Sequence, residues 1–549
     1  MIMDVQPSWR FYGREMEIKM LESDLEFLPD PHGKRNGRRQ FSVLKIRGRR
    51  GLGKTRLIQE TIPRVPRGLP FVLYELPNPK RESTSIGAIN QELLLKAGEV
   101  GLGEELQGIL QPVSQYTTDT HRFMDILQAY MKLGAVVVLD EFHLVKDLGL
   151  VSYAKQAIDQ GIFGRDSHPG KIVLMGSHQQ KLQDLFTASA PLYGKVNAHV
   201  HLHPWPLSTI MEMASEQGIL KEPGKFLTLW TAYGGIPRNW ERYCTDDRFA
   251  HLHSISDEKE WRMAFLMAEK AFLTEPMERF DARTFIELTP EVRDVLLWFG
   301  REHPRGAKLD LIPSELGSRA FKLEACEMLR TDLDLMDRYG PLLIRDNVRW
   351  KITDQYTLFQ INVFRELMTP SDDRMALEFD KTPELARMMT IEGVGMESLA
   401  TAFMAEQEGI NWKQSNVWHT HVAGEGDIDV LAANTMVDPW KVWLGEAKRN
   451  EDQFNTGKIK NFQDRFLAKL GDGSQARKVQ AADLGRVLFA PVINSNKRDG
   501  FRKKGFQAID ILDMARTYGI DPHPIANPDP EPDIEEIHKP DPGHSPMKP

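Results

Sequence analysis

The sequence predicts a mixed α/β protein of several domains, because the chain is long and strands alternate with helices in two separate stretches. Its 549 residues exceed the ~100 to 200 residues of a typical domain. A second α/β alternation, at residues 377–520, is separated from the first, at residues 8–240, by a helical region at residues 241–370. In the first stretch, β-rich runs typical of a parallel sheet occur at Phe41–Arg47, Phe71–Leu76, Ala135–Leu139 and Lys171–Gly176.

The composition is that of a protein that folds in water, with 41% hydrophobic and 27% charged residues. The longest apolar runs, such as Ala135–Leu139, are far shorter than the ~20 residues that a membrane-spanning helix needs. The N-terminal segment has no basic start followed by an apolar stretch, and Cys244 and Cys326 are too few for a disulfide framework. We expect a cytoplasmic protein without a membrane partner.

A phosphate-binding loop is predicted directly after the first β-rich run. The segment GRRGLGKT at residues 48–55 matches GxxxxGK[ST] and leads into a helical stretch. Glycines let backbone N–H groups surround phosphates, the lysine adds a positive charge, and the hydroxyl can bind Mg²⁺. The residues expected to bind ATP are Gly48, Gly51, Gly53, Lys54 and Thr55, and Thr55 is also expected to bind Mg²⁺.

The rest of this site is predicted at the ends of two further strands. The run Ala135–Leu139 ends in Asp140, expected to hold Mg²⁺, and Glu141, expected to orient or deprotonate the attacking water. The strand Lys171–Gly176 ends beside Ser177, which is expected to contact the γ-phosphate of ATP. The alternative for Ser177 is an ordinary polar strand end.

A winged helix is predicted over residues 289–354. Thr289, Pro290 and Glu291 form a helix start, because the hydroxyl can cap free N–H groups, proline suits the first turn and the acid complements the helix dipole. Two helices and a two-stranded end are expected to follow. The alternative is a plain helical connector.

Three residues of the second α/β stretch form a candidate metal-dependent site. Asp429 lies in a strand predicted at Asp427–Ala432, and Glu446 and Lys448 lie in one predicted at Val442–Lys448. Because side chains alternate across a strand, pairing of the two strands would bring all three to one sheet edge. Asp429 and Glu446 could then bind Mg²⁺ or Mn²⁺, and Lys448 could stabilise the charge that develops on a phosphate. The alternative is an exposed hairpin with weak surface ion pairs.

Several short segments resemble the archaeal-type ATPases of the AAA+ and STAND groups. FYGREME at residues 11–17 resembles their FxGRExE box, which lies near the nucleotide base, and PLYGK at residues 191–195 resembles PLYGR, with Lys195 in place of arginine. GGIPR at residues 234–238 is similar to an element that follows the ATPase core. The resemblance implies that Arg238 contacts the γ-phosphate and that the chain can form a homo-oligomer.

Some of these ATPases continue into a winged helix and a restriction-endonuclease-like domain, and this chain resembles that order from residue 8 to about residue 520. The acids and lysine described above resemble the PD-(D/E)xK site of such nucleases, which implies DNA as a partner, with RNA left open. Glu397, on a helix predicted at Gly395–Ala405, resembles a further catalytic acid of these nucleases, and Glu392 is the alternative because the rotation of the helix is open. Further strands are expected at Val417–Val422 and Arg486–Val492.

The net charge of 70 − 78 = −8 does not favour a nucleic-acid partner, yet basic residues cluster in two places. A loop with Lys34, Arg35, Arg38 and Arg39 is expected either to contact phosphates or to be solvated. The cluster expected to contact DNA contains Lys497, Arg498, Arg502, Lys503 and Lys504. Residues 522–549, with nine prolines, six acids and two lysines, are expected to be disordered and contribute −4 to the net charge.

Two groups of histidines alternate along predicted strands, one at residues 199, 201 and 203 and the other at residues 419 and 421. They could bind zinc, but apolar residues alternate with the first group. The simpler interpretation is that they form the exposed faces of half-buried strands.

These patterns predict an ATPase that regulates a metal-dependent, DNA-cleaving domain, and analogy suggests a role in defence or mobile-element biology. The alternative is a signalling or scaffold ATPase whose C-terminal domain binds nucleic acid or a partner without cutting. A third interpretation is a transcription regulator that acts through residues 289–354.

Overall fold

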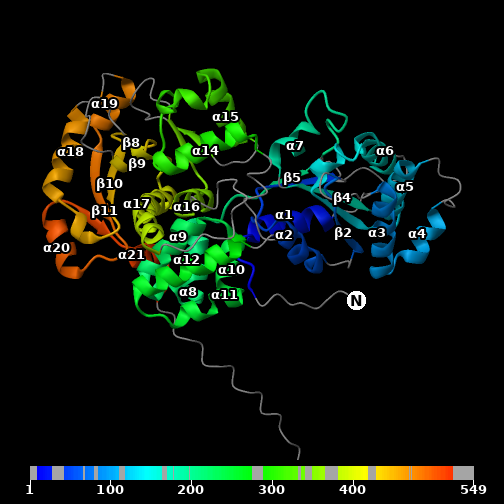
Figure 1. The fold of residues 1–549 in the computed structure, drawn as a ribbon, viewed down its shortest axis with the longest axis horizontal. Helices are drawn as coiled ribbons and strands as arrows, with labels where there is room; N and C mark the ends of the chain where they lie inside the picture. The colour runs from blue at the N-terminus through cyan, green and yellow to red at the C-terminus, as the bar shows by residue number, and fades with distance from the viewer. Residues whose placement is uncertain are drawn as a thin grey trace, which may run out of the picture.

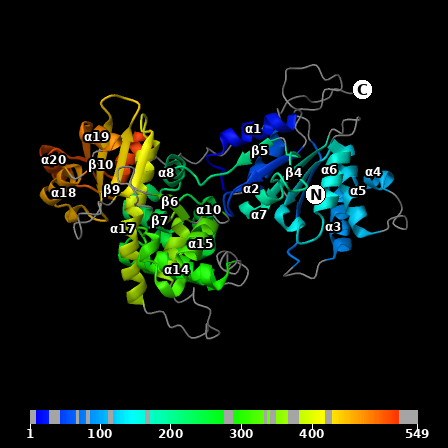
Figure 2. The same cartoon turned by 90° about the horizontal axis from the view of Figure 1, so that it is seen from above.

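The computed structural model describes residues 9–26, 43–65, 69–79, 85–110, 118–162, 170–176, 178–196, 198–274, 288–331, 336–339, 349–364, 381–417, 428–468, 470 and 473–522. The described chain forms two lobes, each built around a five-stranded sheet, with a helical region between them (Figures 1 and 2). Several predictions lie outside the described residues: those for Ser177, Asp427, His419 and His421, for the basic loop at residues 34–39, and for the tail from residue 523.

The N-terminal sheet is parallel and confirms the predicted mixed α/β fold. Its strand order is β2-β3-β4-β1-β5, and each neighbouring pair is parallel. Strands buried on both faces need near-continuous apolar residues, and this accounts for the run VVVL at the start of β3. The strands are β1 (Val43–Arg47), β2 (Phe71–Glu75), β3 (Val136–Asp140), β4 (Lys171–Gly176) and β5 (Ala198–His201).

Helices cover both faces of this sheet, each over its own apolar core. On one face α1 (Glu15–Glu26) and α2 (Lys54–Thr61) pack on alternate side chains of β1, β3 and β4. The other face carries α3 (Ile86–Glu99), α4 (Gly103–Ile109), α5 (Asp119–Lys132), α6 (Val151–Ile162) and α7 (Gln179–Asp184). Along β5, Val200 is buried and His199 is exposed, which is the alternation expected there.

Where the structure describes it, the middle region is helical except for one small sheet. Thr289 caps its helix as expected, because its hydroxyl accepts a hydrogen bond from the Val292 N–H at 3.5 Å. Ala307 forms an isolated antiparallel bridge with Trp350, beside the antiparallel pair β6 (Met336–Tyr339) and β7 (Arg349–Ile352). The helices are α8 (Leu207–Glu216), α9 (Pro223–Tyr233), α10 (Pro237–Thr245), α11 (Asp247–Ala250), α12 (Glu258–Thr274), α14 (Pro290–Glu302), α15 (Arg319–Thr331) and α16 (Gln355–Val363).

The C-terminal sheet is mixed, with the order β12-β11-β10-β9-β8. The first three strands in sequence pair antiparallel, and β10, β11 and β12 are parallel. A strand covers Trp412–Val417, where it pairs with β9, and the rest of the strand predicted at Val417–Val422 lies outside the described residues. The strands are β8 (Trp412–Val417), β9 (Ile428–Asn434), β10 (Lys441–Ala447), β11 (Asp483–Phe489) and β12 (Gln507–Ile509).

The long helix α17 (Lys381–Glu406) joins the middle region to this sheet. It packs on α9 and α16 on one side and on β8–β10 on the other (Figure 1). The sequence predicts this helix only from Gly395. Glycines at positions 393 and 395 disfavour a helix, but the packing of α17 on both sides outweighs that cost. The far face of the sheet carries α18 (Thr456–Ala468) and α19 (Ser474–Gln480), and α20 (Ser495–Lys503) and α21 (Ile511–Thr517) complete the lobe.

One apolar core runs through the middle region, α17 and the near face of the C-terminal sheet. Residues 205–240, which belong to the predicted domain 8–240, therefore share their core with the C-terminal half. Among the described residues, no helix is both long and apolar enough to cross a membrane.

Gly395 allows α17 to approach α9 closely, and we predict that adding one methyl group there destabilises the protein. A Cβ at Gly395 would lie 1.9 Å from the Thr231 hydroxyl oxygen, whereas a Cβ at Gly393 would have no atom within 4 Å. Gly395→Ala should lower the free energy of unfolding by ~1–3 kcal/mol. Gly393→Ala should leave it unchanged or raise it by up to ~1 kcal/mol, because alanine favours a helix.

Differential scanning calorimetry of the two variants checks this prediction. Thr231→Ala in the Gly395→Ala background should recover part of the loss, because it removes the nearest atom. Equal melting temperatures for the two single variants would contradict it.

Candidate functional site

The loop at residues 48–53 connects β1 to α2 as predicted, and its glycines adopt conformations that other residues rarely adopt. Gly48, Gly51 and Gly53 have φ angles of 152°, 81° and 85°. Space is also restricted, because a Cβ at Gly48 would lie 2.9 Å from the Leu202 carbonyl oxygen. The loop therefore depends on glycine both for its backbone angles and for its packing.

Lys54 is buried at the start of α2 and turns its amine into this loop. Its Nζ donates hydrogen bonds to the carbonyl oxygens of Gly48 at 2.8 Å and Arg49 at 3.2 Å. Burial lowers the pKa of Lys54, although the charges of Glu141 and Asp140 act in the opposite direction. Nearby negative charge therefore does not offset the cost of burying the Lys54 ammonium group. An anionic ligand would supply the missing negative charge.

Asp140 and Thr55 face each other across the site, as the sequence predicts. The Thr55 hydroxyl donates to Asp140 Oδ2 at 3.0 Å, and the Glu141 N–H donates to Asp140 Oδ1 at 2.8 Å. Burial, and next the charge of Glu141, raise the pKa of Asp140. A hydroxyl beside a carboxylate is an oxygen ligand set that suits Mg²⁺, and a cation would reverse this shift.

Glu141 has a strained backbone, with φ at 50°, in the left-handed region that non-glycine residues rarely adopt. Its Oε2 lies 3.2 Å from Nδ1 of the buried His143. His143 in turn packs near His178, whose pKa burial lowers to about 3. The strained backbone and the contact with His143 thus fix the position of Glu141 at the end of β3, and an ordinary strand end would need neither.

These residues line a pocket of about 430 Å³, a size typical of small-molecule sites. Arg238 lies in its wall, and the backbone N–H of Arg238 donates to the Gly51 carbonyl oxygen at 3.2 Å. The structure therefore brings Gly51, Gly53, Lys54, Thr55, Asp140, Glu141 and Arg238 together around one pocket, which Trp9, Phe11, Arg50, Arg56, Trp205 and Glu241 also line.

The sequence analysis missed two arginines that brace this loop. Arg14, in the FYGREME segment, is buried and donates to the carbonyl oxygens of Leu52 at 3.4 Å and His203 at 2.5 Å. Arg49, inside the loop, pairs with Asp354, which lies 305 residues further along the chain. The FYGREME motif could have pointed to Arg14, because this residue lies within it. No local sequence pattern could have identified Asp354 as the partner of Arg49.

The second candidate site is on β9 and β10, whose antiparallel pairing brings Asp429, Glu446 and Lys448 together. Asp429 Oδ2 accepts hydrogen bonds from the Ala447 N–H at 2.8 Å and from Lys448 Nζ at 3.2 Å. Lys448 Nζ also lies 2.5 Å from Glu446 Oε1. Burial would lower the pKa of Lys448, but the charges of Asp429 and Glu446 outweigh it and raise this pKa above its usual value.

Helix α17 presents Glu392, rather than Glu397, to the residues that follow β10, next to Lys448. Glu392 is fully buried, and its Oε2 accepts from Arg449 Nε at 2.6 Å. Glu397 is turned to Arg305 of the middle region, at 3.1 Å. The rotation of the helix, left open by the sequence, turns Glu397 to Arg305, so the ion pairs do not support Glu397 as a catalytic acid.

Acidic residues already neutralise part of the basic cluster at residues 497–504. Lys497 lies 3.1 Å from Glu451, and Arg498 lies 2.6 Å from Asp510. Arg502, Lys503 and Lys504 are exposed at the end of α20. The expected positive surface is therefore smaller than the sequence alone indicates.

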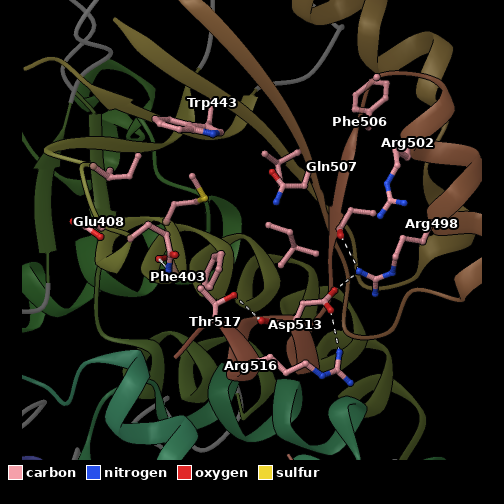
Figure 3. A pocket seen from close by; sticks show the side chains of 17 residues that line it. Phe403, Glu408, Trp443, Arg498, Arg502, Phe506, Gln507, Asp513, Arg516 and Thr517 are labelled. Carbon is pink, nitrogen blue, oxygen red and sulfur yellow. Dashed lines mark hydrogen bonds and ion pairs between the residues drawn. The ribbon is translucent and has the colours of Figure 1, made fainter. Parts of the chain in front are cut away.

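A larger pocket, of about 860 Å³, lies on the α17 side of the C-terminal sheet (Figure 3). Trp443 and Phe506 line it, together with Arg498 and Arg516, which are both paired with Asp513. Trp443 and Glu446 are three positions apart on β10 and so face opposite sides of the sheet. This pocket is therefore separate from the acidic site.

Within the described ranges, no three histidine, cysteine or acidic residues form a group that could hold a metal ion.

Comparison with known proteins gives structural similarities only. No protein-family model matches the chain, and no curated protein matches its sequence. A Walker-type ATPase of Pyrococcus abyssi is 19% identical, with 66% of this chain and 99% of that chain covered and a TM-score of 0.46. The ORC2 protein of Aeropyrum pernix, in ADPNP–ADP complexes, is 14% identical, with 71% and 96% covered and a TM-score of 0.43. Cdc6p from Pyrobaculum aerophilum is 13% identical, with 66% and 96% covered and a TM-score of 0.32. Because these scores are below 0.5, the functional assignment rests on the residues of this chain.

The different partners of Glu392 and Glu397 lead to a stability prediction. Glu392 pairs with Arg262, which is also buried, at 2.7 Å, whereas the partner of Glu397, Arg305, is 44% exposed. Glu392→Gln should therefore cost ~3–5 kcal/mol, because it removes the buried carboxylate that pairs with both Arg262 and Arg449 and leaves Arg262 only the half-exposed Glu258. Glu397→Gln should cost ~1 kcal/mol, because water can solvate Arg305.

Thermal unfolding of the two variants at neutral pH tests this order. A larger loss for Glu397→Gln than for Glu392→Gln would show that the ion pairs are assigned to the wrong residues.

Proposed function

We propose that the chain binds and hydrolyses ATP at the pocket formed by residues 48–55, 140–141 and 238. The observation that carries this proposal is the buried Lys54 amine, which lies in a glycine-shaped loop opposite the Thr55–Asp140 pair. A cation and backbone N–H groups at a helix start suit a triphosphate. Trp9 and Phe11, in the wall of the same pocket, supply flat apolar surfaces for a base.

The charged and hydroxyl-bearing residues around the phosphate-binding loop have separate roles in the proposed reaction. Lys54 would exchange its two carbonyl partners for phosphate oxygens, and Arg238 would add positive charge near the terminal phosphate. Thr55 and Asp140 would hold Mg²⁺, which neutralises phosphate charge when bound. Glu141 would orient or deprotonate the water that attacks the terminal phosphate.

We further propose that the C-terminal domain cleaves phosphodiester bonds, with DNA as the expected substrate. The supporting observation is the convergence of Asp429, Glu446 and Lys448 on adjacent strands. The two carboxylates would hold Mg²⁺ or Mn²⁺, which activates water when bound. Lys448 would then stabilise the negative charge that develops on the phosphate. The exposed Arg502, Lys503 and Lys504 would attract the nucleic-acid backbone.

The remaining assignments belong to the same proposal. They are membership of the AAA+ and STAND groups, a winged helix at residues 289–354 and a homo-oligomer. The small sheet of β6 and β7, with the bridge from Ala307, supports the winged helix.

One observation favours the alternative, a signalling or scaffold ATPase with a non-cutting C-terminal domain. Lys497 and Arg498 are engaged with acids of the same domain, so they offer less charge to a nucleic acid than expected. The cleavage experiment below separates the two functions.

Two variants test the ATP site. Lys54→Ala should weaken ATP binding at least ~100-fold, because it removes the cation that balances the phosphates. Glu141→Gln should bind ATP within about twofold of the natural protein but lose 10²–10⁴-fold in kcat, because only the base is changed. Titration calorimetry and phosphate release measure the two effects. Full hydrolysis by Glu141→Gln would exclude Glu141 as the base.

Cleavage of DNA and RNA in Mg²⁺ or Mn²⁺, with and without ATP, tests the second site. Asp429→Asn and Glu446→Gln should each lower cleavage at least ~100-fold, while their ATP hydrolysis stays within twofold. Lys54→Ala should alter the ATP dependence of cleavage without abolishing it. If the natural protein hydrolyses ATP but cuts no substrate, the non-cutting alternative holds.

A further inference from the structure

The side chain of Arg49 links the proposed nucleotide site to the C-terminal half of the chain. Its two terminal nitrogens bind the two carboxylate oxygens of Asp354, Nη1 to Oδ1 at 2.6 Å and Nη2 to Oδ2 at 2.7 Å. Such parallel, two-pronged contacts fix both distance and orientation. The side chains are 12% and 2% exposed, so solvent barely competes with the pair.

Asp354 also begins helix α16, so one carboxylate fixes two elements. As the N-cap, it accepts a hydrogen bond from the Thr357 N–H at 2.8 Å. Burial alone would raise the pKa of Asp354, but the charge and hydrogen bonds of Arg49, together with Thr357, lower it. The carboxylate is therefore charged at neutral pH, and the phosphate-binding loop is tied to the first turn of α16.

The backbone of the same arginine is part of the nucleotide site. Lys54 Nζ donates to the carbonyl oxygens of Gly48 and Arg49, the bonds that a phosphate would replace. While that exchange takes place, the anchored side chain of Arg49 holds the loop in place. A loop held in its binding conformation loses less entropy when the ligand binds.

The contact continues from α16 into α17. Gln355 Nε2 donates to the Ser398 hydroxyl oxygen at 2.6 Å, and a cavity of about 580 Å³ is lined by Arg49, Asp354, Gln355 and Ser398. Helix α17 also carries Glu392, which pairs with Arg449 beside Lys448. The cavity leaves space for α16 to shift when the loop changes conformation. Because α16 contacts α17, such a shift would act on α17.

We propose that Asp354 is a positioning residue of the nucleotide site: it holds Arg49, and with it the phosphate-binding loop, in the conformation that accepts the triphosphate. This inference rests on the proposed function, because it requires that ATP binds at residues 48–55. It assigns part of the nucleotide site to a residue outside the N-terminal lobe. Nucleotide affinity then depends on how α16 is seated against α17.

Removal of the charge on Asp354, with its helix cap kept, tests this proposal in the full-length chain. Asparagine is also a good N-cap, so Asp354→Asn leaves a partner for the Thr357 N–H. We expect ATP affinity to fall about tenfold and KM to rise by the same factor, with kcat within twofold, because Thr55, Asp140 and Glu141 are untouched. Arg49→Met should give the same loss, and the double variant should be no weaker than either single variant.

Asp510→Asn is the matched control. Asp510 is likewise a buried helix N-cap paired with an arginine, Arg498, at 2.6 Å, but it lies in the C-terminal lobe. It should lower the melting temperature without changing ATP affinity. Unchanged affinity in Asp354→Asn, or an equal loss in Asp510→Asn, would overturn the proposal. If the natural protein itself does not bind ATP, the proposed function fails instead.

Discussion

The burial of helix α17 on two sides is the constraint on which the architecture depends. Met388, Ile391 and Leu399 belong to the core that the helix shares with α9, α16 and the C-terminal sheet. Two packed surfaces on one helix leave little freedom for either neighbour, because interiors are close-packed and transmit displacements. The close approach at Gly395 shows how tightly the helix is held. The middle region and the C-terminal lobe therefore behave as one packed unit, although their sequences indicate separate domains.

Buried ion pairs link the elements around α17, and they contribute to orientation more than to stability. Glu392, Asp354 and Glu269 are each nearly or fully buried, and each pairs with an arginine. Desolvation of two charges offsets most of their attraction, so such pairs add little net stability compared with apolar packing. A misplaced partner, however, would leave an unpaired charge in the interior. The pairs therefore disfavour other rotations of α17 and other positions of α16.

Local patterns in the sequence predicted those parts of the molecule that depend on neighbouring residues. The loop at residues 48–55 needs glycines at fixed spacing, and alternation along two strands was enough to bring Asp429 and Glu446 together. Contacts between distant segments were not predictable in this way. Glu397 was assigned from a helix whose start and rotation were unknown. The Arg49–Asp354 pair joins segments 305 residues apart, and no periodicity relates them. Part of the positive charge of the basic cluster at residues 497–504 is neutralised by ion pairs with the acids at residues 451 and 510. Only the fold brings these acids close to the cluster.

Burial lowers the pKa of the lysine in each candidate site, but the net pKa shifts have opposite signs, and this difference separates the chemistry of the sites. Burial dominates at Lys54 and lowers its pKa, so that site favours an added anion. At Lys448 the two carboxylates outweigh burial and raise the pKa, so that lysine already has negative partners. A divalent cation at Asp429 and Glu446 would have to displace the ammonium group from both acids. The displaced lysine would then be available to a phosphate only once the metal is in place. In the proposed reaction, metal binding and lysine release would therefore be one electrostatic exchange.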